Sequence, residues 1–414
     1  MVVGLLFLVG VINYADRTSI TALYTLLKSD LGFSDVGIGA IGSFFLWSYA
    51  LASPLAGHLG DRTNRGSLVI WSLAGWSLVM ILTGLTATRG QILAMRVLLG
   101  LIESLYLPAA LALVAEYHDF ATRAKAQSML SVGQYLGMVV GGTLAGYLGE
   151  QQGWRSPMYV LGGVGLTLAV LCWRFLPRGS VGAVRVVSQE HQKQEVTFLQ
   201  GIRSLVRIPS FLVLAGGGVL TAIGAWIFIN WLPLYFRENF GSSLAEAGFL
   251  GSSLVSISAA VSQLFGSAIS DAIAKKGVYR RLWMNAILIL AAAPTLLTFV
   301  VTKNRTAVMV ALVLYSAFRN AGDLNLVPLL CDVAGKQRMS IAIGVTNMLN
   351  TLVGGAGILA AGFLKSGFGL TSVFTGIALI LLLDAGLLFI GCVFFMRRDL
   401  QRTLPEQTLT SQLR

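Results

Sequence analysis

The chain has 414 residues, of which 55% are hydrophobic and only 12% are charged, and its mean hydropathy is +0.76. Soluble domains carry about 25% charged residues, so this composition excludes an ordinary soluble protein and predicts a chain that is nearly all membrane domain. The net charge of +12 indicates a nucleic-acid partner only if the basic residues gather in a patch, and they are instead spread over many short polar segments.

Apolar stretches of about 20 residues, the length that a bilayer core requires, recur along the whole chain. The first begins at residue 2 with no basic region before it and no cleavage site after it, so it predicts a span rather than a signal peptide. We expect a short tail to precede it. The twelve predicted spans are 2–26, 38–59, 67–87, 91–115, 127–148, 157–176, 210–236, 244–270, 282–301, 306–330, 339–364 and 371–396.

A polar segment at about 178–200 is the only long hydrophilic stretch, and it separates two sets of six predicted spans. We therefore expect an N-terminal six-helix bundle over 1–177, a central loop over 178–205, and a C-terminal bundle with a short tail over 206–414. The fold class is an all-α membrane protein with twelve transmembrane helices in two pseudo-symmetric bundles.

The basic residues predict how the chain is oriented in the membrane. Of the 30 Lys and Arg, 20 lie in the even-numbered connections and the C-terminal tail, 7 lie in the odd-numbered connections, and 3 lie inside spans. Cytoplasmic loops carry an excess of Lys and Arg, so both termini and the central loop are predicted to be cytoplasmic in an inner membrane. The basic excess is thereby explained without nucleic acid.

The two predicted halves resemble each other weakly. In each half an outer loop leads through a Gly- and Ser-rich span to an acidic residue, Asp61 in the first and Asp271 in the second. The fourth and tenth spans each hold an arginine followed by a proline. Related halves of this kind are typical of secondary transporters, whose site lies near the midplane between the repeats and is exposed alternately to the two sides.

The stretch Gly57 to Gly66, read as GHLGDRTNRG, resembles the loop 2–3 signature of the major facilitator superfamily. It departs from that pattern at Asn64, where the family prefers Gly. The resemblance extends over essentially the whole chain and implies the facilitator fold. In that family the loop latches the two halves in the outward-open state, which implies that Asp61, Arg62 and Arg65 form a cytoplasmic gate. A basic anchor alone would not need Asp61.

Three further motifs resemble the anion:cation symporter branch of that superfamily, which includes sugar-acid and phthalate permeases. They are the NYADR stretch from Asn13 to Arg17, the spacing of Arg96 and Glu103 ahead of Pro108, and the WLPLY stretch that begins at Trp231. Spinster-type lipid transporters share the first motif and the Arg96–Glu103 spacing, so the resemblance leaves two kinds of substrate open.

Charged residues inside a span cost about 2.5–3.5 kcal/mol each on insertion scales, so they persist only when they are paired or face a polar cavity. They are Asp16, Arg17, Arg96, Glu103, Arg319, Asp323 and Asp384. If they have no functional role, they pair only to neutralise one another. Asp384 has no obvious partner in the sequence and lies on a span that this fold usually keeps peripheral.

Spacing favours a functional role for the first four charged residues. Arg96 and Glu103 are seven residues apart and share one helix face, and Gly100 between them allows a neighbour to approach. Asp16 and Arg17 diverge by about 100°. A carboxylate that exchanges water for an arginine partner can bind a proton on one side and release it on the other. We predict that Asp16 and Glu103 carry protons.

Arginine matches a carboxylate bidentately, so Arg17 and Arg96 are predicted to bind an anionic substrate. The resemblance implies the same division of roles. Inward polar and aromatic residues would complete the site, although buried Asn and Gln often only join helices. The predicted substrate contacts besides the two arginines are Tyr14, Gln134, Trp226, Asn230, Arg319, Asp323 and Asn347, with Asn325 and Asn350 as further candidates.

The sequence contains none of the common motifs for nucleotide binding or hydrolytic catalysis. No Walker A sequence, no metalloprotease HExxH and no GxSxG is present, and the three Cys and three His are scattered, so we expect no enzyme, cofactor or metal. The leading prediction is a monomeric proton-coupled symporter of a small organic anion such as a carboxylate or sugar acid. Spinster-like export of a lipid or amphipathic compound is the alternative within transporters. A non-transporting receptor or intramembrane enzyme is the alternative outside them.

Overall fold

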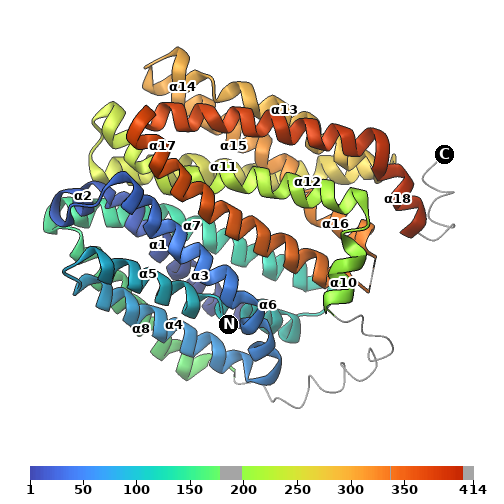
Figure 1. Ribbon diagram of the computed structural model, residues 1–414. Helices are drawn as coiled ribbons and strands as arrows, with labels where there is room; N and C mark the ends of the chain where they lie inside the picture. The colour runs from blue at the N-terminus through green and yellow to red at the C-terminus, as the bar shows by residue number, and fades with distance from the viewer. Residues whose placement is uncertain (178–197, 336, 404–414) are drawn as a thin grey trace. The chain divides into compact units, whose positions relative to one another are not determined.

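A computed structural model describes residues 1–177, 198–335 and 337–403. For His58, Asp61, Arg62, Phe120, Ala121, Ala124, Phe198, Arg402 and Thr403 it describes the backbone alone. The described residues form helices joined by short turns (Figure 1). The helices are α1 Val2–Ala22, α2 Tyr24–Leu31, α3 Asp35–Arg62, α4 Arg65–Gly84, α5 Arg89–Glu103, α6 Tyr106–Tyr117, α7 Phe120–Gln152, α8 Arg155–Phe175, α10 Phe198–Leu205, α11 Pro209–Phe240, α12 Leu244–Ala274, α13 Arg280–Thr295, α14 Thr298–Val301, α15 Arg305–Asp323, α16 Leu326–Ala334, α17 Met339–Ile390, the π-helix η1 Gly391–Phe395, and α18 Met396–Thr403.

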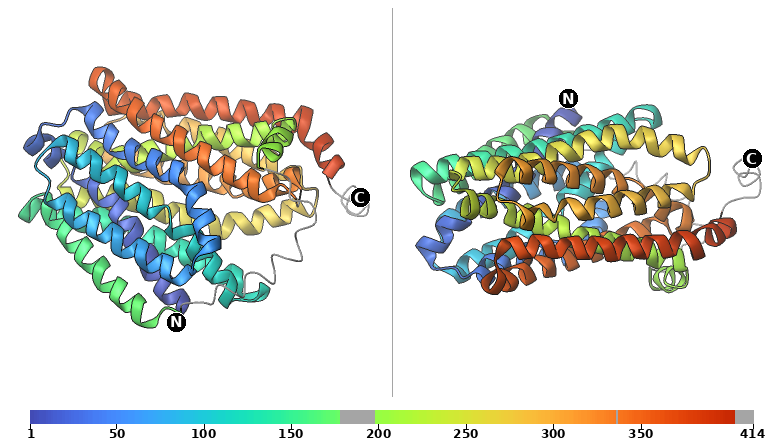
Figure 2. Two further views of the ribbon diagram at one scale, coloured as in Figure 1. Left: turned by 60° about the horizontal axis from the view of Figure 1, so that its bottom comes forward. Right: turned by 90° about the horizontal axis from the view of Figure 1, so that it is seen from above.

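Ten helical stretches among the described residues are long and apolar enough to cross a membrane. The last of them, Met339–Gln401, has 63 residues, far more than the roughly 20 that one crossing needs. Its backbone leaves the helical conformation at Gly369, with φ 76° and ψ 167°. A residue with a side chain rarely adopts that positive φ, so this glycine permits the turn that divides α17, between its orange and red lengths in Figures 1 and 2.

Local sequence signals begin and end the helices. The Ser34 hydroxyl accepts a hydrogen bond from the Gly37 amide at the start of α3. Thr88 and Gln91 form a reciprocal capping box at the start of α5. Gly32 ends α2 in the left-handed conformation, with φ 66°. These caps satisfy backbone groups that the helix ends leave unpaired, so the polar turns lie where the hydropathy pattern places the connections.

The described helices divide into two compact units that do not follow the two halves of the sequence. The first unit takes residues 1–192 together with 226–256 and 355–367, and the second takes 193–225, 257–354 and 368–414. Parts of α11, α12 and α17 therefore belong to the first unit although they come from the second half of the chain. The predicted domain boundary at 178–205 stays a prediction, since residues 178–197 lie outside the described part of the structure.

Small residues bring the helices of the first unit into close contact. A Cβ atom on Gly133 would lie 2.8 Å from the backbone oxygen of Phe7, and one on Gly137 or Gly141 would meet the backbone of α1 in the same way. The glycine stripe of α7 thus allows α1 to pack against its backbone, as expected for small residues spaced by four in a membrane helix. This packing fixes α1, which carries half of the candidate site.

In the second unit, α13 lies beside α15, and the C-terminal helix returns to the start of α11. Asp399 of α18 accepts hydrogen bonds from the Ser210 amide, at 3.0 Å, and from the Ser210 hydroxyl, at 2.8 Å. The carboxylate thereby caps the N-terminus of α11, where the helix dipole favours a negative charge. Figure 2 shows α18 as the continuation of the red length of α17.

Candidate functional site

A buried ion pair joins α1 and α5 in the first unit. The Nε atom of Arg17 donates to the Oε2 atom of Glu103 at 2.7 Å, and the Nδ2 atom of Asn13 donates to the same oxygen at 2.9 Å. Glu103 is fully buried, and its Oε1 atom accepts no hydrogen bond from the described residues. One oxygen of this carboxylate is therefore held by a cation, while the other is open to a proton.

Aromatic rings surround both arginines of this cluster. The Arg17 guanidinium lies 4.9 Å from the ring centre of Tyr14, 4.8 Å from that of Tyr49 and 5.2 Å from that of Phe45. The Arg96 guanidinium lies 4.7 Å from the ring centre of the same Phe45. Cation–π contacts stabilise a cation that has lost its hydration water. The rings therefore help to stabilise two positive charges in one region shielded from solvent.

Arg96 is only 3% exposed, and a carboxylate does not hold it in the way that Glu103 holds Arg17. Its Nε atom donates to the Ile41 carbonyl at 3.4 Å, and its charge acts on Asp16 and Glu103 through space. The guanidinium has five N–H groups, and the hydrogen bond described for it uses one of them. Arg96 is therefore suited to receive a further acceptor.

Asp16 is fully buried and forms no ion pair with its sequence neighbour Arg17 among the described residues. Neither of its carboxylate oxygens accepts a hydrogen bond from the described residues. The indole of Trp76 is its neutral neighbour, and the Nε1 atom of that ring also lacks an acceptor within hydrogen-bond distance. A buried carboxylate without a direct partner is costly. Asp16 is therefore stabilised either by binding a proton or by the positive charge of Arg96.

The chain places Glu103 at a break in a membrane helix. α5 ends at Glu103, and α6 begins at Tyr106. Pro108 lacks the N–H for a helical bond to Ser104, and its ring crowds that carbonyl, which explains the break. Glu103 thus lies at the negative end of the α5 dipole, where a cation or a proton is favoured.

The glycine between Arg96 and Glu103 serves helix packing. A Cβ atom on Gly100 would meet the Ser48 side chain and the backbone of Phe45 and Tyr49. The missing side chain therefore lets α3 approach α5, and this approach brings the Phe45 and Tyr49 rings to the two arginines. The spacing predicted a close neighbour here, and that neighbour is a helix.

None of the hydrogen bonds described for Gln134, Trp226 and Asn230 reaches the Arg17–Glu103 ion pair. The Tyr24 hydroxyl donates to the Oδ1 atom of Asn230 at 3.1 Å, and Asn230 donates to the Trp226 carbonyl at 2.9 Å. Asn230 also fills the space beside Gly42 of α3. Gln134 lies beside Gly10 of α1. Asn230 thus makes the helix-joining contact that is the alternative to substrate binding.

A second charge cluster lies in the second unit. Arg319 donates from Nη2 to the Oδ2 atom of Asp323 at 2.7 Å, within α15. Asp384 of α17 is 1% exposed, and a Cβ atom on Gly217 of α11 would lie 2.8 Å from its Oδ1 atom. The charges of Asp323 and Arg319 act on Asp384. The residue expected to be peripheral and without a partner is therefore buried near an arginine and another carboxylate.

Contacts are described for three asparagines of the second half. Asn325 is fully buried, donates to the Gly322 carbonyl and accepts from the Ser270 hydroxyl at 2.5 Å. Asn350 lies beside Gly218, and the backbone carbonyl of Asn347 accepts from the Thr351 hydroxyl. Asn325 thus joins α12 to the break between α15 and α16.

The predicted gate lies partly outside the described residues, because the side chains of Asp61 and Arg62 are not described. Arg65 forms an ion pair with Glu116 of α6 and donates to the Ala112 carbonyl. This contact ties the start of α4 to α6 within the first unit.

The sequence profile of the Major Facilitator Superfamily matches residues 6–358, and a second match covers residues 214–411. The chain belongs to the Major Facilitator Superfamily. This facilitator is similar to the probable galactarate/D-glucarate transporter GarP of Escherichia coli (strain K12), with 25% identity over 431 residues that cover 97% of this chain and 96% of GarP. It is also similar to the voltage-gated purine nucleotide uniporter SLC17A9 of Mus musculus, with 26% identity over 399 residues that cover 92% of this chain and 87% of the relative.

A solved structure shares the fold of the facilitator. It is the crystal structure of a bacterial homolog to the human lysosomal transporter Spinster, in an inward-facing and unoccupied conformation, with a TM-score of 0.83 and 19% identity. The match covers 96% of this chain and 97% of that one, and at this identity it shows the fold alone. The family and these relatives are transporters and not enzymes. The predicted family is confirmed, and so are its predicted resemblances, in sequence to a named sugar-acid transporter and in fold to a Spinster homolog.

Proposed function

We propose that this facilitator is a secondary active transporter that moves a small organic anion, a carboxylate or sugar acid, together with protons by alternating access. The relative GarP, named as a probable galactarate/D-glucarate transporter, supports the substrate class. Two buried arginines in one cluster support it independently, because a guanidinium binds a carboxylate through two parallel hydrogen bonds.

The observation that carries the proposal is the ion pair between Arg17 and Glu103. A substrate carboxylate and the Glu103 carboxylate compete for the same guanidinium. When a proton binds Glu103, Arg17 loses its internal partner and becomes available to the anion. When the proton leaves, Glu103 reclaims Arg17 and the anion is displaced. Proton binding and anion binding therefore favour one another.

Charge balance in the cluster supports the same coupling. Asp16 and Glu103 together match Arg17 and Arg96 in charge, and three of these side chains are at most 3% exposed while that of Arg17 is 11% exposed. An anion that enters alone adds an uncompensated charge to a region of low dielectric, which is costly. An anion that enters with one proton for each of its carboxylates adds none, so a dicarboxylate such as D-glucarate needs two protons. Asp16, which lacks a direct partner, is the second proton-binding group in this proposal.

The proposal also covers the arrangement in the membrane, further substrate contacts and the cytoplasmic gate. The ten apolar stretches become twelve spans when Met339–Gln401 is divided at Gly369 and α7 is added. We place them in two bundles, in an inner membrane with both termini cytoplasmic, in a monomer. Further substrate contacts are assigned to Tyr14, Gln134, Trp226, Asn230, Arg319, Asp323 and Asn347, and the gate to Asp61, Arg62 and Arg65.

Uptake of labelled D-glucarate or galactarate into proteoliposomes under an imposed pH gradient tests the proposal. Wild-type protein is expected to accumulate one of these acids above the outside concentration. Glu103→Gln is expected to lose this accumulation but to retain exchange of labelled for unlabelled acid, because Arg17 then stays available without proton transfer. Glu150→Gln, at an exposed glutamate near the end of α7, is the matched control and should accumulate the acid like wild type.

Accumulation by Glu103→Gln equal to that of wild type would overturn the assignment of the proton site. Uptake driven by membrane potential without a pH gradient would indicate a uniporter, as SLC17A9 is named. Spinster-like export predicts instead that a labelled lipid or amphipathic compound leaves the vesicles while the sugar acids are not transported.

A further inference from the structure

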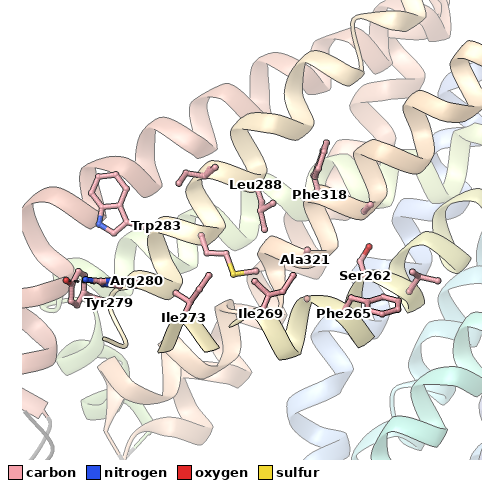
Figure 3. Close-up of a pocket in the computed structure, with 15 residues that line it drawn as sticks. Ser262, Phe265, Ile269, Ile273, Tyr279, Arg280, Trp283, Leu288, Phe318 and Ala321 are labelled. Carbon is pink, nitrogen blue, oxygen red and sulfur yellow. Dashed lines mark hydrogen bonds between the residues drawn. The ribbon is translucent and has the colours of Figure 1, made fainter. Parts of the chain in front are cut away.

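An apolar groove of about 820 Å³ opens between α12, α13 and α15 in the second unit (Figure 3). Small residues make its floor: a Cβ atom on Gly266 would lie 3.3 Å from that of Ala321. Larger side chains such as Phe265, Ile269 and Phe318 stand at its sides. The groove therefore exists because small residues let α12 and α15 approach while the neighbouring side chains project outward.

The groove faces the surroundings of the helices rather than the interior of the unit. Phe265 is 69% exposed, and Ile269 and Ile287 are each 54% exposed. An exposed apolar patch of this kind on a membrane-spanning unit lies against lipid. From Val261 to Ile273 the α12 wall rises ~18 Å at 1.5 Å per residue, which is close to one leaflet of a hydrocarbon core of about 30 Å.

One end of the groove is basic. Figure 3 shows Tyr279, Arg280 and Trp283 together there. Arg280 Nε donates to the Tyr279 hydroxyl at 3.5 Å, and the guanidiniums of Arg280 and Arg397 each lie 6.0 Å from the Tyr279 ring centre. The hydrogen bond from Arg280 and the charges of both arginines lower the pKa of Tyr279. The neighbouring Arg281 is paired with Asp271 at 2.8 Å, so its charge is offset locally.

This end lies on the membrane face whose loops hold most of the Lys and Arg residues. Trp283 stands at the groove rim, in the position that tryptophans favour at a membrane–water interface. Basic pockets between helices at such a face attract anionic lipid headgroups. A headgroup near Arg280 and Arg397 would place its acyl chain along the apolar wall toward Phe265.

A second groove, in the first unit, offers a contrast. It holds about 460 Å³ between α4 and α8, and its lining, which includes Trp71, Val170 and Trp173, contains no Lys, Arg, Asp or Glu. Both grooves are apolar, but the larger one alone of these two has arginine in its lining. Lipid chains suit either groove, whereas of these two grooves only the larger one is expected to prefer a charged headgroup.

We propose that the groove between α12, α13 and α15 is a binding site for a phospholipid with an anionic headgroup. The headgroup is bound by Arg280, Arg397 and the Tyr279 hydroxyl, and one acyl chain lies between Phe265 and Phe318. The lipid is a resident ligand of the transporter and not its cargo, because the groove is built from the outward side chains of one unit and contains none of the buried carboxylates.

Native mass spectrometry of the full-length protein with phosphatidylglycerol and phosphatidylcholine tests the site. Wild type is expected to retain phosphatidylglycerol in preference to phosphatidylcholine. Arg280→Gln with Arg397→Gln is expected to reduce that preference about 25-fold, at roughly a factor of five for each arginine near a lipid headgroup. Arg203→Gln with Arg207→Gln removes equal charge outside the groove and should leave the preference unchanged.

A second variant tests the apolar part without changing charge. Ala317→Leu narrows the floor of the groove and is expected to reduce retention of both lipids, while Ala74→Leu narrows the smaller groove and should leave the phosphatidylglycerol preference intact. The proposal is overturned if wild type shows no preference. It is also overturned if the control pair of arginines matters as much as Arg280 and Arg397. Because the readout is lipid retention, its outcome is independent of the proposed sugar-acid transport.

Discussion

The two charge clusters of this facilitator lie on helices with the same break. α5 ends at Glu103 and α15 ends at Asp323, and a proline follows each carboxylate by five residues, Pro108 in one helix and Pro328 in the other. In both, the proline prevents the helical hydrogen bond to the residue four positions earlier. The common geometry places a carboxylate at the negative end of a helix dipole, where a cation is favoured.

The two clusters differ in how that cation is supplied. Glu103 takes Arg17 from another helix, whereas Asp323 takes Arg319 from its own helix, four residues earlier. A pair between helices is made or broken when the helices move, but a pair within one helix persists as long as the helix does. The first cluster is therefore suited to a switch that couples proton and substrate, and the second to a fixed charge.

Removing Arg17 should have the largest effect on stability. Arg17→Gln leaves Glu103 buried without its cation, and breaking a buried pair in this way costs about 3–5 kcal/mol. We expect a lower melting temperature in detergent and no accumulation of substrate. The double variant Arg17→Gln with Glu103→Gln should recover most of the melting temperature while transport stays absent, because the uncompensated charge is gone but the anion-binding group is still missing.

The equivalent pair of variants in the second cluster, Arg319→Gln alone and with Asp323→Asn, is the control for this comparison. Its rescue should be smaller because both side chains are partly exposed, at 16% and 24%. Equal losses and equal rescue in the two clusters would contradict the distinction between a switching pair and a fixed pair.

The Phe45 ring should have the next largest effect. It contacts both guanidiniums of the first cluster, and desolvated cation–π contacts contribute up to about 2 kcal/mol. Phe45→Leu keeps an apolar side chain but loses the ring, so we expect a loss of about 1–2 kcal/mol in stability and weaker anion binding in thermal-shift titrations. Phe44→Leu, at the neighbouring ring that packs on Trp47, should affect stability through packing but should leave anion binding unchanged.

The charged members of both clusters could be found in the sequence because a charge inside an apolar span is costly and therefore rare. The sequence could not predict which of these residues pair with one another. Asp16 and Arg17 are adjacent, yet Arg17 pairs with Glu103, 86 residues away, and that choice depends on how α1 and α5 pack. Asn13, Phe45, Tyr49 and Trp76 were not predicted as parts of the site.

Composition explains why those neutral residues were missed. In a soluble helix the buried face is apolar and the exposed face is polar, but a membrane span is apolar all round. Hydropathy therefore locates the spans without telling which side faces the protein. The glycines did carry that information: Gly100 and the Gly133, Gly137 and Gly141 stripe mark close helix contacts. Gly100 lies opposite Phe45 and Tyr49, so a systematic use of glycine spacing could have pointed to the aromatic rings.

Of the proposed substitutions, Asp384→Asn should have the smallest effect on stability. It tests whether the second cluster binds a proton. Its cluster has two carboxylates for one arginine among the described residues, so full ionisation leaves one uncompensated negative charge that a single proton cancels. Asp384→Asn replaces that protonated form with a neutral side chain of the same shape, so the cluster keeps no uncompensated buried charge. We expect little change in the melting temperature and unchanged coupling of uptake to the pH gradient.

The matched control is Asp323→Asn, which removes the carboxylate that Arg319 binds directly and should cost about 1 kcal/mol. Melting temperatures measured across a pH series give the decisive comparison. If Asp384→Asn alone abolished gradient-driven accumulation, the second cluster would be a proton-coupling site as well, and the contrast between a switching pair and a fixed pair would fail.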